Sequence, residues 1–230
     1  MTRLFILFLI AFHLFPEVVS GTLIKGDSID NQILYNGRLW RNLYHRVVGD
    51  QFLFTSELLE GSVTIEGMQF KNVMLRYDIF QDELLAMNRK DMIILLNREK
   101  IDNFTLSFNN RQFDFIKLDN DSINNLSGYV NILLRGEVSI WVKYRKEIVM
   151  LGHEGRLDKF NQVQRIFLVK EEKAYQVKSK RDILRLLNDQ KQVLRDFMRK
   201  DKSEISKNSP DTFIPVILFY NKLNSAPDET

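Results

Sequence analysis

Residues 128–146, GYVNILLRGEVSIWVKYRK, contain the pattern that decides the fold. In the second half of this stretch, apolar side chains occupy every second position: Val138, Ile140, Val142 and Tyr144. This spacing gives an extended strand one apolar face and one more polar face, which is typical of an antiparallel sheet. The Gly of the preceding pair Arg135-Gly136 tolerates the positive φ that tight turns require. The stretch therefore predicts a β-hairpin within an antiparallel sheet.

Further alternating runs lie on both sides of this hairpin, separated by pairs of turn-forming residues. The turns are expected at Asn36-Gly37 (between strands at 33–35 and 39–40), Glu66-Gly67, Asn109-Asn110 and Glu171-Glu172. Met92–Leu96, MIILL, is apolar on both faces and should be a central strand or one that is covered on both sides. About ten to twelve strands at this density predict a large, curved antiparallel sheet or partial barrel.

Beyond the last strand the apolar period changes from two to about 3.6 residues, which is typical of helices. Ser179, with Asp182 three residues later, predicts a helix start related to the capping box. Ser209-Pro210-Asp211 predicts another start, with Pro at the first helical position. We therefore expect an α+β fold in which two or three helices at 179–223 pack on the sheet, followed by a flexible polar tail at 224–230.

The N-terminal residues have the layout of a secretory signal peptide. Residues 1–3 form a short, positively charged segment, residues 4–15 (LFILFLIAFHLF) form an apolar run, and Pro16 ends this run. Such a run is too short for a stable membrane anchor. We expect a signal peptide at 1–20 and a β domain at 21–178.

The rest of the sequence narrows where an exported chain of this kind would act. No Cys is present, so no residue is available for a bacterial lipoprotein anchor or for disulfides, which many secreted small domains carry. No run of eighteen apolar residues occurs after the signal-peptide region, so we expect no transmembrane helix in the mature chain. We expect a periplasmic or outer-membrane-associated location.

The amino-acid composition limits the kinds of partner that the chain would bind. Apolar residues make up 44% of the chain and exclude global disorder. The formal net charge is +3, but the charges are interspersed, which favours a mixed surface over a polyanion-binding one. Basic and aromatic residues interleave at 40–46 and 141–146. An alternating strand produces the same string, so we expect no nucleic-acid partner.

Catalytic motifs are absent, and the candidate residues are few. No Gly-x-Ser-x-Gly elbow, phosphate-binding Gly loop or pair of His at metal-ligand spacing occurs, so no cofactor and no metal are expected. Asp78 and Asp82 would share one face of an extended strand and could form a carboxylate pair for acid–base chemistry. His153 lies in a loop-like Gly-His-Glu-Gly stretch. The structural alternative is that Asp78 lies on the polar side of a strand, that Asp82 and Glu83 lie in a turn and that His153 is a solvated loop histidine.

The composition also supports the binding of an apolar ligand. A curved sheet lined by Phe, Leu, Ile and Met forms a pocket if the C-terminal helices leave its concave face open. If Ile183, Leu187, Leu194 and Phe197 fill that face, the same residues are core. Both alternatives remain open at this point.

The strings FLVKEEKAYQVKSKRDILRLLNDQKQVLRDFMRKD and FIPVILFYNKL resemble the C-terminal part of uncharacterised exported β-rich proteins common in Bacteroidetes. GSVTIEGMQFKNVMLRYDIFQDEL is similar to the strands of the same group. The resemblance covers roughly residues 33–222 and implies a periplasmic or outer-membrane-facing location, without functional residues. A weaker, architectural likeness exists to periplasmic lipoprotein carriers (LolA-like folds), whose curved sheet and helical lid hold acyl chains.

These observations favour an exported, non-enzymatic envelope protein. It would bind a lipid or other apolar ligand, or a partner protein of the envelope, on a curved sheet. The alternatives are a periplasmic hydrolase that uses acidic residues and a purely structural interaction module.

Overall fold

The computed structural model describes residues 31–123, 126–150 and 157–225. The largest part of this structure is one open antiparallel sheet in the order β1-β5-β4-β3-β2-β6-β7-β8-β9-β10-β11. The strands are β1 (Arg38–Leu39), β2 (Leu59–Ile65), β3 (Met68–Asp78), β4 (Glu83–Met87), β5 (Ile93–Leu95), β6 (Ile101–Phe108), β7 (Arg111–Ile123), β8 (Leu126–Leu134), β9 (Ser139–Val149), β10 (Lys159–Lys170) and β11 (Lys173–Val177). The predicted α+β fold with a large curved antiparallel sheet is confirmed.

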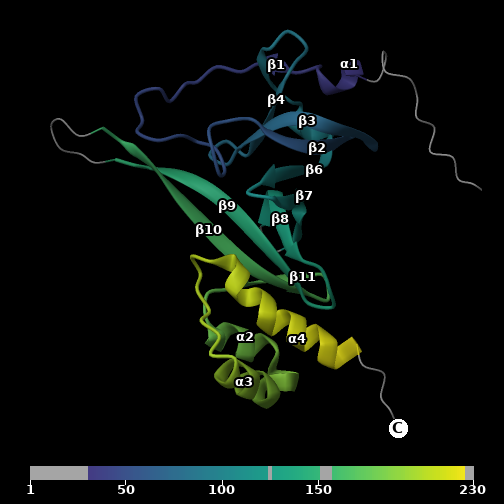
Figure 1. Ribbon diagram of the computed structural model, residues 1–230, viewed down its shortest axis with the longest axis vertical. Coiled ribbons are helices and arrows are strands. Elements are labelled where there is room, and N and C mark those ends of the chain that lie inside the picture. Colours follow the sequence, from purple (N-terminus) through teal and green to yellow (C-terminus); the bar gives the residue numbers. More distant parts are fainter. Residues whose placement is uncertain (1–30, 124–125, 151–156, 226–230) are drawn as a thin grey trace, which may run out of the picture.

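Four helices accompany the sheet within the described ranges: α1 (Asn31–Leu34), α2 (Lys180–Leu186), α3 (Lys191–Lys200) and α4 (Ile214–Ser225). Short 3₁₀ turns lie at Arg98–Lys100, Asn188–Gln190 and Pro210–Phe213. Figure 1 shows α2, α3 and α4 gathered at one end of the long β9–β10 hairpin. Among these described helices, none combines the length and the apolar character needed to cross a bilayer.

Three of the predicted turn pairs adopt the positive φ that two-residue hairpin turns demand. Arg135-Gly136 does not: neither residue has a positive φ, and a longer connection joins Leu134 to Ser139. Asn109 and Asn110 have φ of 50° and 58°, and Glu171 and Glu172 have φ of 51° and 61°. Two successive residues at positive φ match the right-handed twist of the strands they join. The Glu66-Gly67 turn also forms, with φ of 50° and 79°. These pairs therefore fix the register of β2–β3, β6–β7 and β10–β11.

The strand expected at residues 33–35 is wrong. Asn31–Leu34 form one helical turn instead, which places Leu34 in the main core at 2% exposure. The following Arg38–Leu39 pairs with β5, not with a hairpin partner across Asn36-Gly37. Burial of a single Leu outweighs the weak strand preference of so short a run.

The doubly apolar stretch around β5 is covered on both sides, as expected. Ile94 packs into the main core with β2, β3 and β6. Leu95 packs on the opposite face with Phe52 and Leu85. β5 is the second strand from the edge of the sheet, not a central strand. Its second face is covered by the loop that carries Phe52.

The C-terminal helices start where the sequence predicts. The Ser179 hydroxyl caps α2 by accepting from the Asp182 amide at 3.4 Å, and the Asp182 carboxylate accepts from the Lys178 amide at 2.9 Å. The hydrogen bond from the Lys178 amide, followed by one that the Ser179 hydroxyl donates to the same carboxylate, lowers the pKa of Asp182. The third segment begins with a 3₁₀ turn at Pro210, so that Pro215 falls in the first turn of α4, where its missing N–H costs nothing.

Side chains of the helices fill the sheet face that they cover. Ile183, Leu187 and Leu194 are fully buried, and they pack against β9, β10 and β11 through residues such as Ile140 and Leu168. Phe197 stacks on Phe219 of α4 with ring centroids 4.2 Å apart. This end of the face is therefore packed core.

We predict that Leu194→Ala lowers the free energy of unfolding by about 2–5 kcal/mol, because it opens a cavity beneath α3. The matched control is Val193→Ala on the same helix, since Val193 is 43% exposed and Leu194 is fully buried. The control should change stability by less than about 0.5 kcal/mol. Urea denaturation measures both, and similar small losses for the two variants would contradict the packing described.

Candidate functional site

Asp78, one of the two candidate acids, is used as a structural acceptor. It ends β3, is 1% exposed, and accepts from Gln51 Nε2 at 2.6 Å and from the amides of Phe80 and Gln81 at 2.9 Å. Burial raises the pKa of Asp78, while these hydrogen bonds oppose the shift. The carboxylate therefore ties the β3–β4 turn to the segment around Gln51, with its oxygens already occupied by donors.

Asp82, the second candidate acid, lies in the same turn at φ 60° but has other partners. Its carboxylate accepts from the Tyr77 hydroxyl, from Arg98 Nη2 at 2.8 Å and from Lys143 Nζ at 2.9 Å. Lys143 also donates to the carbonyl of Tyr129 at 2.9 Å. We call Asp82, Tyr77, Arg98 and Lys143 the Asp82 network.

The electrostatics of the Asp82 network follow from burial. The side chain of Lys143 is 10% exposed and that of Asp82 is 20% exposed. Desolvation lowers the pKa of Lys143, and the charge of Asp82 opposes this shift. Burial and the neighbouring Asp82 raise the pKa of Tyr77 well above its usual value, so its hydroxyl stays a donor. The carboxylate of Asp82 forms ion pairs with two cations and accepts a hydrogen bond from one phenol hydroxyl. These partners leave it poorly suited to general acid–base catalysis.

The Asp82 network joins strands that are distant in the sheet. Four strands (β2, β6, β7 and β8) lie between β3, which leads into the Asp82 turn, and β9, which carries Lys143. In a flat sheet that separation would be about 24 Å. The ion pair at 2.9 Å, together with the hydrogen bond from the Lys146 amide to the Ile79 carbonyl, therefore requires a strongly bent sheet.

Glycine is required at the centre of the network. Gly128 on β8 has φ 76°, and a Cβ there would lie 1.8 Å from an Asp82 carboxylate oxygen. The chain must approach this closely for the turn to reach β8 and β9.

The inside of the bend is filled by aromatic side chains. Tyr77, Phe104, Phe115 and Tyr129 are all buried. Their ring centroids lie 4.6–5.7 Å apart, with Phe104 and Phe115 stacked. Together with the helices over β9–β11, these rings occupy the concave face that an apolar ligand would need.

The two acids do not form the carboxylate pair that an extended strand would give. A turn separates them, and their hydrogen-bond partners are different. His153 lies outside the described residues. Within the described ranges, no group of three or more His, Cys, Asp or Glu side chains is placed to hold a metal.

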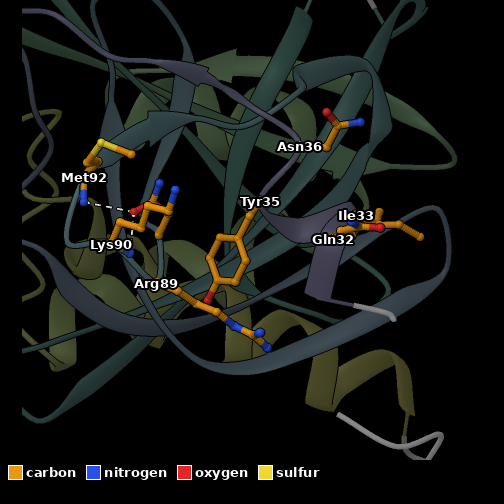
Figure 2. Close-up of a pocket in the computed structure, with 8 residues that line it drawn as sticks. Gln32, Ile33, Tyr35, Asn36, Arg89, Lys90 and Met92 are labelled. Carbon is orange, nitrogen blue, oxygen red and sulfur yellow. Dashed lines mark hydrogen bonds between the residues drawn. The ribbon is translucent and has the colours of Figure 1, made fainter. Parts of the chain in front are cut away.

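A surface pocket of about 700 Å³ lies between α1 and the β4–β5 turn. It is lined by Gln32, Ile33, Tyr35, Asn36, Asn88, Arg89, Lys90 and Met92. Figure 2 shows the Tyr35 ring directed toward Arg89. The Asn88 side-chain oxygen accepts from the amides of Lys90 at 2.9 Å and Met92 at 3.0 Å. The lining has cations and amides but no carboxylate or imidazole, so it suits binding of a small polar molecule better than acid–base catalysis.

A second groove, of about 590 Å³, follows the free edge of β10. β11 pairs only with Ile166–Lys170, and Val48 forms a single bridge to Lys159. Between these two contacts, residues 161–165 have no strand partner on that edge among the described parts of the chain. We call this stretch the β10 edge.

The register shows which backbone groups face the groove. Lys170 and Lys173 flank a two-residue turn, so their backbone groups bond to each other. The Phe160 amide donates to the Val48 carbonyl at 3.0 Å, again on this side of the strand. Because direction alternates along a strand, the N–H and C=O groups of Gln162 and Gln164 point into the groove.

The wall opposite the β10 edge comes from the loop before α4. Gln164 Nε2 donates to the Lys207 carbonyl at 3.3 Å, and Lys207 and Asn208 line the groove. Three exposed cations, Arg165, Lys178 and Lys207, lie along it against one carboxylate, Glu147. Sequence analysis placed this hairpin at residues 165–177 and missed the groove. Residues 159–165 carry no apolar alternation, since Phe160 and Val163 lie three positions apart, so the sequence did not indicate that β10 is longer than its partner strand.

Comparisons with known proteins give no match: no protein-family model fits the chain, and neither curated proteins nor solved structures contain a significant relative. The resemblances to exported Bacteroidetes proteins and to lipoprotein carriers stay predictions.

We predict that Asp82→Asn lowers the free energy of unfolding by about 3–5 kcal/mol, because it leaves the Lys143 charge buried without its partner. Lys143→Met should cost less, since Asp82 keeps Arg98 and Tyr77. The double variant should lose less than the sum of the two singles, and urea denaturation measures this coupling.

The control for this cycle is Asp196→Asn, which breaks the Asp196–Arg199 pair on α3, whose side chains are 47% and 80% exposed. It should change stability by less than about 1 kcal/mol. Additive losses at Asp82 and Lys143 would show that the network does not hold the bend.

Proposed function

We propose that this chain is an exported, non-enzymatic protein of a bacterial envelope that binds an extended segment of a partner polypeptide along the β10 edge. The observation that carries the proposal is the unpaired stretch at residues 161–165, which lies in a walled groove. The N-terminal pattern at residues 1–20 supports export.

An added strand fits this groove chemically. The open N–H and C=O groups of Gln162 and Gln164 can pair with a peptide backbone, which is how strand addition supplies affinity. Edge strands with free backbone groups otherwise recruit other chains without selection. Here the loop at Lys207 and Asn208 limits access to one side, so the edge accepts a single segment.

The charges along the groove select the segment. Arg165, Lys178 and Lys207 outnumber Glu147, so acidic side chains on the bound segment complement the lining. A Glu- or Asp-bearing extended peptide is therefore the partner that the groove suits.

The other candidate functions have less support. The aromatic rings inside the bend and the helices on β9–β11 fill the face where an apolar ligand would bind. The carboxylate oxygens of Asp78 and Asp82 accept hydrogen bonds from donors that hold the fold together. The two acids that a hydrolase would use are therefore engaged in structural contacts.

We predict that an alternating Glu/Val heptapeptide binds at least about tenfold more tightly than the matched Lys/Val peptide, because of the basic lining. Gln162→Pro should abolish binding without unfolding the protein, since its N–H faces the groove and Pro is tolerated at such edges. Fluorescence anisotropy of the labelled peptides measures both effects.

Val163→Pro is the matched control, because the Val163 N–H faces β9 and its loss should destabilise the sheet itself. Absence of binding by the acidic peptide, or unchanged binding by the Gln162→Pro variant, would contradict strand addition at the β10 edge.

A further inference from the structure

The most exposed apolar side chains of the described residues gather at one end of the sheet. Five large apolar residues are more than half exposed: Met150 (81%), Leu43 (74%), Leu157 (62%), Leu39 (54%) and Val48 (53%). All except Leu39 lie at the far end of β9 and β10 or in the loop beside it. We call Leu43, Val48, Met150 and Leu157 the apolar tip.

Backbone contacts hold these residues in one place. The Val48 amide donates to the Asp158 carbonyl at 2.8 Å, next to Leu157. Val48 bridges Lys159, which pairs with Val149 of β9, next to Met150. These contacts bring the backbones of Val48, Met150 and Leu157 together at the same end of the β9–β10 pair.

Aromatic packing fixes the loop that carries Leu43. The ring of its neighbour Tyr44 lies 4.9 Å from Phe80 and 5.9 Å from Phe160, in edge-on contacts. The Val47 amide closes the loop by donating to the Tyr44 carbonyl at 2.9 Å. Leu43 is thus held at the end of the sheet by its neighbours, with its own side chain outside the core.

Figure 1 shows that the paired ends of β9 and β10 extend past the rest of the sheet, away from α2, α3 and α4. The apolar tip is therefore a projection. Its members are aliphatic, whereas protein-binding hot spots are enriched in aromatic residues and Arg seated in pockets.

Cations flank the tip. Arg41, Arg46 and Lys159 are exposed and form no ion pair with another described residue. The described carboxylates nearby are Glu147, Asp158 and Asp50, and Asp50 is paired with Lys146 at 2.8 Å, so positive charge is in excess among the described residues. Aliphatic side chains flanked by basic ones suit the boundary between the headgroups and acyl chains of an anionic bilayer.

We propose that the apolar tip inserts into the surface of an anionic phospholipid bilayer and anchors the protein there reversibly. This inference is independent of the partner segment proposed for the β10 edge. The two fit together, because residue 161 lies only four residues beyond Leu157, about 13 Å along an extended strand. A segment bound at the β10 edge would therefore be held close to the membrane.

Flotation with vesicles tests the proposal. The chain used begins at Gly21, so that the apolar run at 4–15 does not itself bind lipid; the described fold starts at Asn31 and loses nothing. The probes are vesicles of phosphatidylglycerol with phosphatidylcholine and vesicles of phosphatidylcholine alone. The parent should float with the anionic vesicles, and high salt should weaken this binding.

The Met150→Asp/Leu157→Asp variant should lose at least about tenfold in vesicle affinity, because both apolar anchors become charged. The matched control is Val193→Asp/Leu218→Asp, whose positions are 43% and 40% exposed on α3 and α4. It should bind as the parent does, and so should Gln162→Pro, which separates this proposal from that of the β10 edge. Thermal unfolding checks that every variant is folded.

Three outcomes would overturn the proposal. The first is failure of the parent to float with either vesicle, and the second is binding of the tip variant that equals that of the parent. The third outcome is a concentration-dependent dimer of the parent, abolished in the tip variant with no vesicle binding, which would assign the apolar tip to a second copy of the chain.

Discussion

The contact between Asp82 and Lys143 is the interaction on which the rest of the structure depends. It joins a turn after β3 to β9 across four intervening strands, at 2.9 Å. A sheet this strongly bent has a concave face narrow enough for Tyr77, Phe104, Phe115 and Tyr129 to fill. Gly128 allows the approach, because a side chain there would collide with Asp82. Charged groups thus join the two sides of the bend, and burial of the aromatic and aliphatic side chains inside it stabilises the fold.

The same bend leaves no open concave face for a ligand, so the two sites that we propose lie at the margin of the sheet. Rings fill the concave face at one end and C-terminal helices fill it at the other. Two features at the margin of the sheet remain exposed. At the β10 edge, β11 is too short to pair with residues 161–165. At the apolar tip, β9 and β10 extend beyond the neighbouring strands. Both features result from unequal strand lengths. A five-residue last strand beside a twelve-residue one leaves backbone groups that water or another chain must satisfy.

Much of the fold could be predicted from local patterns, because alternation, turn pairs and caps are encoded within a few residues. The Asn109-Asn110 turn and the Ser179 cap are examples. The candidate site could not be predicted this way. That Asp82 meets Lys143 depends on sheet order and curvature, which connect residues 61 positions apart. Asp78 and Asp82 were expected on one strand face, but a turn between them sends their side chains to different partners. The β10 edge was missed because an absent partner leaves no local signal except strand length.

The central claim is that the sheet bends until the turn after β3 meets β9, and that the backbone groups of β10 at 162 and 164 are left without a strand partner. Amide hydrogen exchange, resolved by residue, tests it in one experiment. The amides of Phe160 and Ile166, paired with Val48 and β11, should exchange slowly, as should that of Lys146, which donates to Ile79. The amides of Gln162 and Gln164 should exchange much faster. Protection of Gln162 and Gln164 equal to that of Ile166 would contradict the account.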